Sequence, residues 1–197
     1  MHWIDPDSLS PVKSKVARFL FNPHGDADGM LLVNGTEAHF PPHLSKQVLK
    51  SIQPGDAVTL YGVKPRAADM IACVAIKSAK GKRIDDTGPP AKAKKKKHAK
   101  NHGEGAGASL TLVEIQETIE RELHGPRGEV RGVLLSSGRI VRFPPHAAVK
   151  ARTLLRPGAV LAVRGEARTV SDTEVIEARA WGKSKSHMKP LAPKPHP

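Results

Sequence analysis

The chain carries one short module twice, and this duplication limits the folds that it can adopt. Four motifs recur at a constant offset of 103 residues. They are Gly-x-Leu-Leu-x-x-Gly at 29–35 and 132–138, Phe-Pro-Pro-His at 40–43 and 143–146, Pro-Gly at 54–55 and 157–158, and a glycine at 62 and 165. A fixed offset over about forty residues is the signature of a duplicated structural unit. We therefore expect one small domain, formed twice.

The order of elements within the module indicates a mainly β structure. Asn34-Gly35 is a strong hairpin signal, and the alternating residues after it read as a strand that ends at a pair of prolines. Leu44, Val48, Leu49 and Ile52 then form a stripe at helical spacing. The strands expected in copy 1 include residues 16–21, 56–62 and 70–76, with two further strands around the turn at Asn34-Gly35. Those in copy 2 cover 118–123, 129–135, 139–143, 159–165 and 174–181, with a helix over 146–155.

One of these segments has two possible interpretations. Residues 118–123 also fit a helix, because Leu112, Ile115, Ile119 and Leu123 share helical spacing. We interpret the segment as a strand by analogy with copy 1. Each copy then has the order of the OB-fold, a five-stranded barrel with one helix between strands 3 and 4. A small open sheet with one packed helix is the alternative, but a closed barrel leaves no exposed strand edges.

The repeated motif also carries a resemblance. Gly-x-Leu-Leu-x-x-Gly followed by Phe-Pro-Pro-His resembles uncharacterised bacterial proteins that are described as OB-fold-like and nucleic-acid-binding. The resemblance covers both modules but neither the segment between them nor the end of the chain. It implies the barrel fold and a nucleic-acid-binding function, and it assigns no catalytic or binding residues.

The net charge of +13 is concentrated outside the two modules. Residues 1–76 have no net charge and residues 104–181 have +1, whereas residues 77–103 carry +8 and residues 182–197 carry +4. Segments rich in Pro, Gly and like charges lack the apolar area that folding requires. The sequence therefore predicts domains at 1–79 and 110–182, a disordered basic linker at 80–109 and a disordered basic tail at 183–197.

Composition limits the class of protein. A single cysteine, Cys73, excludes an intramolecular disulfide framework, and no apolar run reaches the length of about 20 residues that a membrane span requires. With no signal-peptide pattern at the start, we expect a cytoplasmic protein without a membrane partner. No nucleophile–base–acid set recurs in both modules, so we expect neither an enzyme nor a cofactor.

Two repeated residue types have both a functional and a structural interpretation. Phe40 and Phe143 could stack on bases, but we favour buried rings that lead into the helix. His43 and His146 are expected to make local hydrogen bonds. With His24 and His39, His43 could also form a metal site in copy 1, but no zinc-type spacing accompanies them and we expect no bound metal.

Basic side chains are the remaining candidates for function. Lysine-rich segments attract polyanions through counterion release, and strands 2 and 3 form the usual binding face of OB-folds. We predict a non-enzymatic accessory protein that binds DNA or RNA without sequence specificity. The alternative is a tandem barrel that binds a protein or a small ligand, with the lysine tract as a solubilising spacer. The predicted contact residues are Lys92, Lys94, Lys95, Lys96, Lys97, Lys100, Arg127, Arg131, Arg139 and Arg142.

Overall fold

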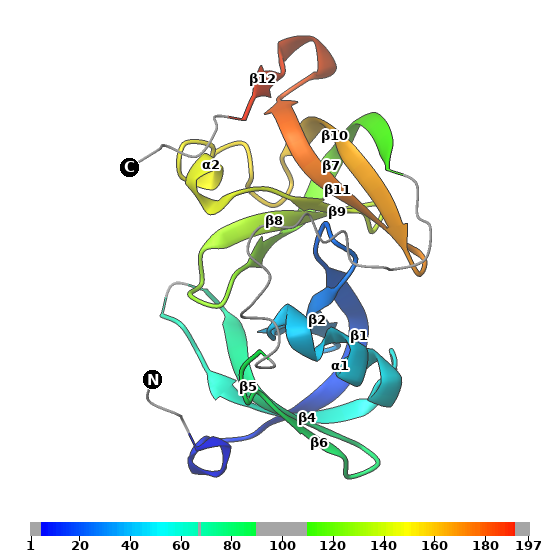
Figure 1. Ribbon diagram of the computed structural model, residues 1–197. Helices are drawn as coiled ribbons and strands as arrows, with labels where there is room; N and C mark the ends of the chain where they lie inside the picture. Colours follow the sequence, from blue (N-terminus) through cyan, green and yellow to red (C-terminus); the bar gives the residue numbers. More distant parts are fainter. Residues whose placement is uncertain (1–4, 67, 90–109, 192–197) are drawn as a thin grey trace. The chain divides into compact units, whose positions relative to one another are not determined.

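The computed structural model describes residues 5–66, 68–89 and 110–191. The chain forms two compact units, and each contains one β-barrel (Figure 1). The first barrel begins after a short 3₁₀ turn, η1 (Pro6–Ser8). Its elements are β1 (Val12–Phe21), β2 (Ala27–Leu32), β3 (Glu37–His39), η2 (Pro42–Leu44), α1 (Ser45–Ser51), β4 (Ala57–Val63), β5 (Met70–Ser78) and β6 (Arg83–Asp85).

The second barrel repeats this order. Its elements are β7 (Thr111–His124), β8 (Val130–Leu135), β9 (Ile140–Arg142), α2 (Pro145–Val149), β10 (Val160–Val170), β11 (Thr173–Gly182), η4 (Lys185–His187) and β12 (Lys189–Pro190). The ambiguous segment at 118–123 lies within β7, so the interpretation as a strand is confirmed.

Each sheet closes on itself in the way that the OB-fold requires. The first sheet runs β3-β2-β1-β4-β5, and a parallel pairing of β3 with β5 closes the ring. The second sheet runs β9-β8-β7-β10-β11 and is closed by a parallel pairing of β9 with β11. Two closed five-stranded barrels, each with a helix between its third and fourth strands, confirm the predicted fold.

The two barrels also share their strand register. Val12 faces Leu60 in the first barrel, and Ile115 faces Val163 in the second, which is the same pairing 103 residues later. Both barrels carry a β-bulge at the repeated glycine, between Tyr61 and Gly62 and between Arg164 and Gly165. After this bulge the offset between equivalent residues becomes 105, because the segment from the repeated glycine to its partner on the next strand, Gly62 to Cys73 and Gly165 to Ala178, is two residues longer in the second copy.

The repeated glycines in the hairpins have a conformational cause. Gly35 and Gly138 close the turns between the second and third strands with φ angles of 85° and 86°. Side chains disfavour this left-handed region, whereas glycine adopts it without steric cost. The Asn-Gly and Ser-Gly signals in the sequence therefore mark real hairpins.

The two helices differ in length. In α1, Val48 is fully buried and Leu44 and Ile52 flank it in the core, as the apolar stripe predicts. In the second copy the predicted helix over 146–155 is too long. α2 ends at Val149, whose side chain is 72% exposed, and the chain continues in turns, with the Leu154 amide donating to the Ala151 carbonyl.

Each barrel gains a sixth strand from a segment that the sequence assigns to linker or tail. β6 pairs with β5 through Ile76 and Ile84, and β12 pairs with β11 through Trp181 and Lys189. Residues 83–85 and 189–190 are therefore ordered, which corrects the prediction of disorder at these positions. The rest of the predicted linker, residues 90–109, and the tail residues 192–197 lie outside the described residues.

Most of the large apolar side chains in the described residues lie in the barrel interiors. Phe40 is fully buried, and Phe143 meets Trp181 edge-to-face, with 4.9 Å between ring centroids. Cys73 is also buried, and loss of solvation raises the pKa of its thiol to about 12. Within the described residues, no helix is long and apolar enough to cross a membrane.

Candidate nucleic-acid interface

The four predicted arginines lie on or beside the second and third strands of the second barrel, together with carboxylates. Arg127 lies in the turn between β7 and β8, and Arg131 lies on β8; both are exposed. Glu129 sits between them: its carboxylate accepts a hydrogen bond from the Arg127 amide at 3.0 Å and lies 4.0 Å from the Arg131 guanidinium. These two arginines reach solvent, but an acidic neighbour offsets part of their charge.

Arg139 is held between two carboxylates of its own barrel. Its guanidinium donates to Glu117 on β7 at 2.5 Å and also to Glu174 on β11. These hydrogen bonds raise the pKa of Arg139 above the ordinary value of an arginine. Burial alone would raise the pKa of Glu117, but hydrogen bonds from Ser137 and Arg139 keep it below its ordinary value. The arrangement joins three strands and neutralises the charge of Arg139.

We expect replacement of this arginine to destabilise the second barrel. Arg139→Gln should cost about 1–2 kcal/mol near neutral pH, between the values for exposed and for fully buried ion pairs. Because the folded pKa of Glu117 is lowered, the contribution is present above the unfolded value, near 4.5, and is lost as the pH falls through the folded value. Urea titrations near neutral pH and at a pH well below 4.5 should show a larger loss at the higher pH.

A matched variant controls for the change in net charge. Arg127→Gln removes an arginine whose side chain is exposed, and it should change stability by less than about 0.5 kcal/mol at either pH. An equal loss for Arg139→Gln at both pH values would show that packing, rather than the ion pair, is responsible.

Arg142 is not a surface residue. Its exposure is 7%, and its side chain lies over Gly132, the residue opposite it on β8. A Cβ atom at Gly132 would lie 2.7 Å from the Val141 carbonyl oxygen and 2.9 Å from the Arg142 side chain, so glycine is needed for the close approach of β9. Of the four predicted arginines, only Arg127 and Arg131 are therefore exposed on the barrel surface. The six predicted lysines, from Lys92 to Lys100, lie outside the described residues.

The repeated aromatic and histidine residues have structural contacts. Phe40 and Phe143 are buried, as predicted, so they offer no open stacking face. The imidazole of His43 lies 3.0 Å from the carboxylate of Asp86, in the segment after β6. This contact joins residues that are far apart in the sequence, rather than the local hydrogen bond that was expected.

In the part of the chain that the structure describes, no cluster of metal-ligating side chains forms, and His24, His39 and His43 are not gathered into one.

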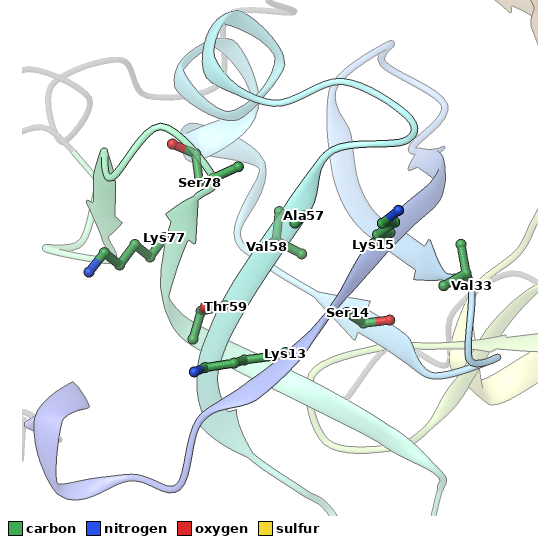
Figure 2. Close-up of a pocket in the computed structure, with 10 residues that line it drawn as sticks. Lys13, Ser14, Lys15, Val33, Ala57, Val58, Thr59, Lys77 and Ser78 are labelled. Carbon is green, nitrogen blue, oxygen red and sulfur yellow. The ribbon is translucent and has the colours of Figure 1, made fainter.

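A groove on the first barrel contains basic residues that are not among the contact residues predicted from the sequence. It has a volume of about 600 Å³ and is formed by β1, β4 and β5, with Val33 at its edge (Figure 2). Lys13, Lys15 and Lys77 line it, and all three are exposed. The sequence shows that Lys13 and Lys15 lie two residues apart on one strand. That Lys77 lies on the same face of the sheet follows only from the strand register.

Comparisons with known proteins do not identify a family. No protein-family model and no curated protein matches the chain. Among solved structures it is similar to the single-stranded DNA-binding protein from Thermus aquaticus, in wild-type form and as a deletion mutant. The identities are 13% and 11%, with a TM-score of 0.26 for both, and coverage is 95% of this chain and 94–95% of the other. The sequence identity and the TM-score are too low to support a fold assignment. The assignment to the OB-fold therefore depends on the strand order of each barrel.

Proposed function

We propose that the protein is a non-enzymatic accessory protein that binds DNA or RNA mainly through charge. The observation that carries this proposal is the distribution of basic residues. Residues 77–103 contain ten basic and two acidic side chains, while the two barrels are close to neutral. A dense run of cations next to folded domains binds polyanions by releasing their counterions, and this needs no sequence-specific pocket.

The barrels add weaker contacts in this proposal. Arg127 and Arg131 are exposed at the start of the second barrel's binding face, whereas Arg139 and Arg142 are occupied by internal contacts. Several weak contacts in one chain raise the overall affinity, because binding of one region increases the effective concentration of the others. The predicted surface is therefore distributed along the chain.

A salt series with labelled oligonucleotides tests this function. We expect the full chain to bind single- and double-stranded DNA and RNA with affinity that falls steeply with salt. Replacement of the six lysines from Lys92 to Lys100 by glutamine should reduce the salt slope by up to about 5 on duplex DNA, at roughly 0.9 per phosphate contact. Fluorescence anisotropy measures both the affinity and the slope.

A chain with residues 91–101 in shuffled order is the matched control. It keeps the charge and length of the segment, so charge-driven binding should be unchanged. A loss of binding on shuffling would indicate sequence-specific recognition instead. No binding by the full chain at physiological salt would contradict the proposal.

One observation favours a second candidate function. The strand 2–3 face of the second barrel pairs arginines with carboxylates, and such mixed charge is typical of surfaces that contact another protein. In this alternative the barrels bind a protein or a small ligand, and the lysine tract keeps the chain soluble. The absence of oligonucleotide binding would direct the search to this class.

A further inference from the structure

The first barrel has a cationic groove outside the usual OB-fold binding face. Lys13 on β1 faces Thr59 on β4, and Thr59 faces Lys77 on β5, so these residues form one row across three strands (Figure 2). Lys15 lies two residues along β1 and therefore on the same face as Lys13. The small side chains of Ala57 and Thr59 occupy the middle strand and leave an open floor between the lysines.

The charges on this groove are not neutralised by neighbours. Among the described residues, neither Lys13, Lys15 nor Lys77 takes part in an ion pair, in contrast to Arg83 next to them, which binds Asp7 and Asp85. Exposed cations without ion-pair partners favour an anionic ligand with several oxygen acceptors.

The second barrel closes the equivalent surface. By register, Gln116 and Thr118 correspond to Lys13 and Lys15, and Gly182 corresponds to Lys77. The turn η4 packs over this position: the Lys185 amide donates to the Gln116 side chain at 3.3 Å. A Cβ atom at Gly182 would lie only 2.2 Å from the His187 carbonyl oxygen.

The first barrel leaves its groove open because the equivalent turn folds back on itself. The connection between β5 and β6 is a tight hairpin, in which the Ser78 amide donates to the Lys82 carbonyl at 2.8 Å and the Gly81 amide donates to the Ser78 carbonyl at 2.9 Å. The equivalent strand pairs Ile76–Ile84 and Trp181–Lys189 enclose the same number of residues, so the difference arises from sequence rather than from length. An open and basic groove is thus a property of the first copy alone.

We infer that this groove binds the phosphate backbone of a nucleic acid. The inference rests on the proposed function and assigns part of that binding to the β1–β4–β5 surface of the first barrel. The segments of this chain outside the described residues are unsuitable occupants, because residues 90–109 and 192–197 carry seven lysines and one glutamate. They would be repelled by the groove, whereas a polyphosphate chain is complementary to it.

Replacing the groove lysines tests the inference. Lys13→Gln and Lys15→Thr introduce the residues that the second barrel has at these positions, and Lys77→Gln completes the triple variant. With a labelled oligothymidylate, the salt slope should fall by about 2, at roughly 0.7 per contact on single strands. The control variant Lys46→Gln, Lys50→Gln and Lys64→Gln removes three exposed lysines elsewhere on the barrel and should keep the slope.

Lysine acetylation of the unmodified full chain gives a second measurement that does not depend on the folding of a variant. With oligothymidylate bound, Lys13, Lys15 and Lys77 should react more slowly, while Lys46 and Lys50 keep their rates. Inorganic phosphate alone, at matched ionic strength, should not slow the acetylation of these lysines. If it slows them as much as the oligothymidylate does, the groove is a site for a single phosphate and the inference is wrong.

The outcomes separate the inference from the proposed function. Binding by the full chain, with equal slopes for the two triple variants and unprotected groove lysines, would overturn the groove assignment and leave the function in place. No binding by the full chain would overturn both.

Discussion

Phe143→Ala should destabilise the second barrel by about 3–5 kcal/mol, the cost of removing a buried aromatic ring. Phe143 is 5% exposed and packs edge-to-face on Trp181, so truncation leaves a cavity and also removes an aromatic pair. The surrounding side chains come from several strands and from α2, so the cavity cannot close through the movement of one element.

Trp181 provides the measurement for this prediction. Its emission reports unfolding of the second barrel in urea, once Trp3, the other tryptophan, is replaced by phenylalanine. Phe143→Leu keeps most of the volume and should lose less than half as much stability, since volume-conserving exchanges cost under about 1.5 kcal/mol. If alanine and leucine give the same midpoint as the parent, Phe143 does not support the core.

Gly165→Ala is the second substitution with a large expected effect. A Cβ atom at this position would lie 2.2 Å from the carbonyl oxygen of Glu177 and 3.0 Å from the Ile176 side chain. The first contact is with the backbone of the neighbouring strand, which cannot move without breaking the pairing at the bulge. We expect a loss of about 2–3 kcal/mol, at the upper end of the range for overpacked cores.

A substitution on the same strand separates this steric effect from a general weakness of β10. Val160→Ala changes a side chain that is 43% exposed and should alter stability by no more than about 0.5 kcal/mol. The same urea titration, followed by Trp181, compares the two variants. A tolerated Gly165→Ala would mean that the bulge can open without cost.

The sequence predicted the parts of the fold that local chemistry determines. Proline pairs, hairpin glycines and the α1 stripe depend on neighbouring residues, and the duplication gave two independent readings of each. Gly62 and Gly165 were visible as repeated residues. The reason that glycine is required at these positions could not be seen in the sequence. It is the close approach of a carbonyl oxygen on the neighbouring strand, from Ala72 to Gly62 and from Glu177 to Gly165.

The short sixth strands could not be predicted from local pattern. β6 contains one buried residue, Ile84, and β12 contains a lysine and a proline, so neither shows apolar alternation. These two segments are held in place by hydrogen bonds to the edge of the preceding strand. Charge and proline content therefore led to the prediction of disorder at these positions.

The candidate site was only partly predictable for a related reason. Arginine content indicated an anion-binding face, but the partners of Arg139 are 22 and 35 residues away, and only the barrel brings them together. The groove lysines were missed because Lys13 and Lys77 belong to strands at opposite ends of the module. Pairing between distant strands is the information that a single sequence does not display.

The matched register of the two barrels has a consequence for biosynthesis. Strands that share sequence and pairing geometry can exchange between neighbouring domains, which is a common way for repeated domains to misassemble. All strands of the first barrel lie before residue 86, and β7 begins at residue 111. At translation rates of about 5–20 residues per second, the intervening 25 residues delay the second copy by roughly 1–5 s. The first barrel therefore has a head start of this length over the strands of the second copy.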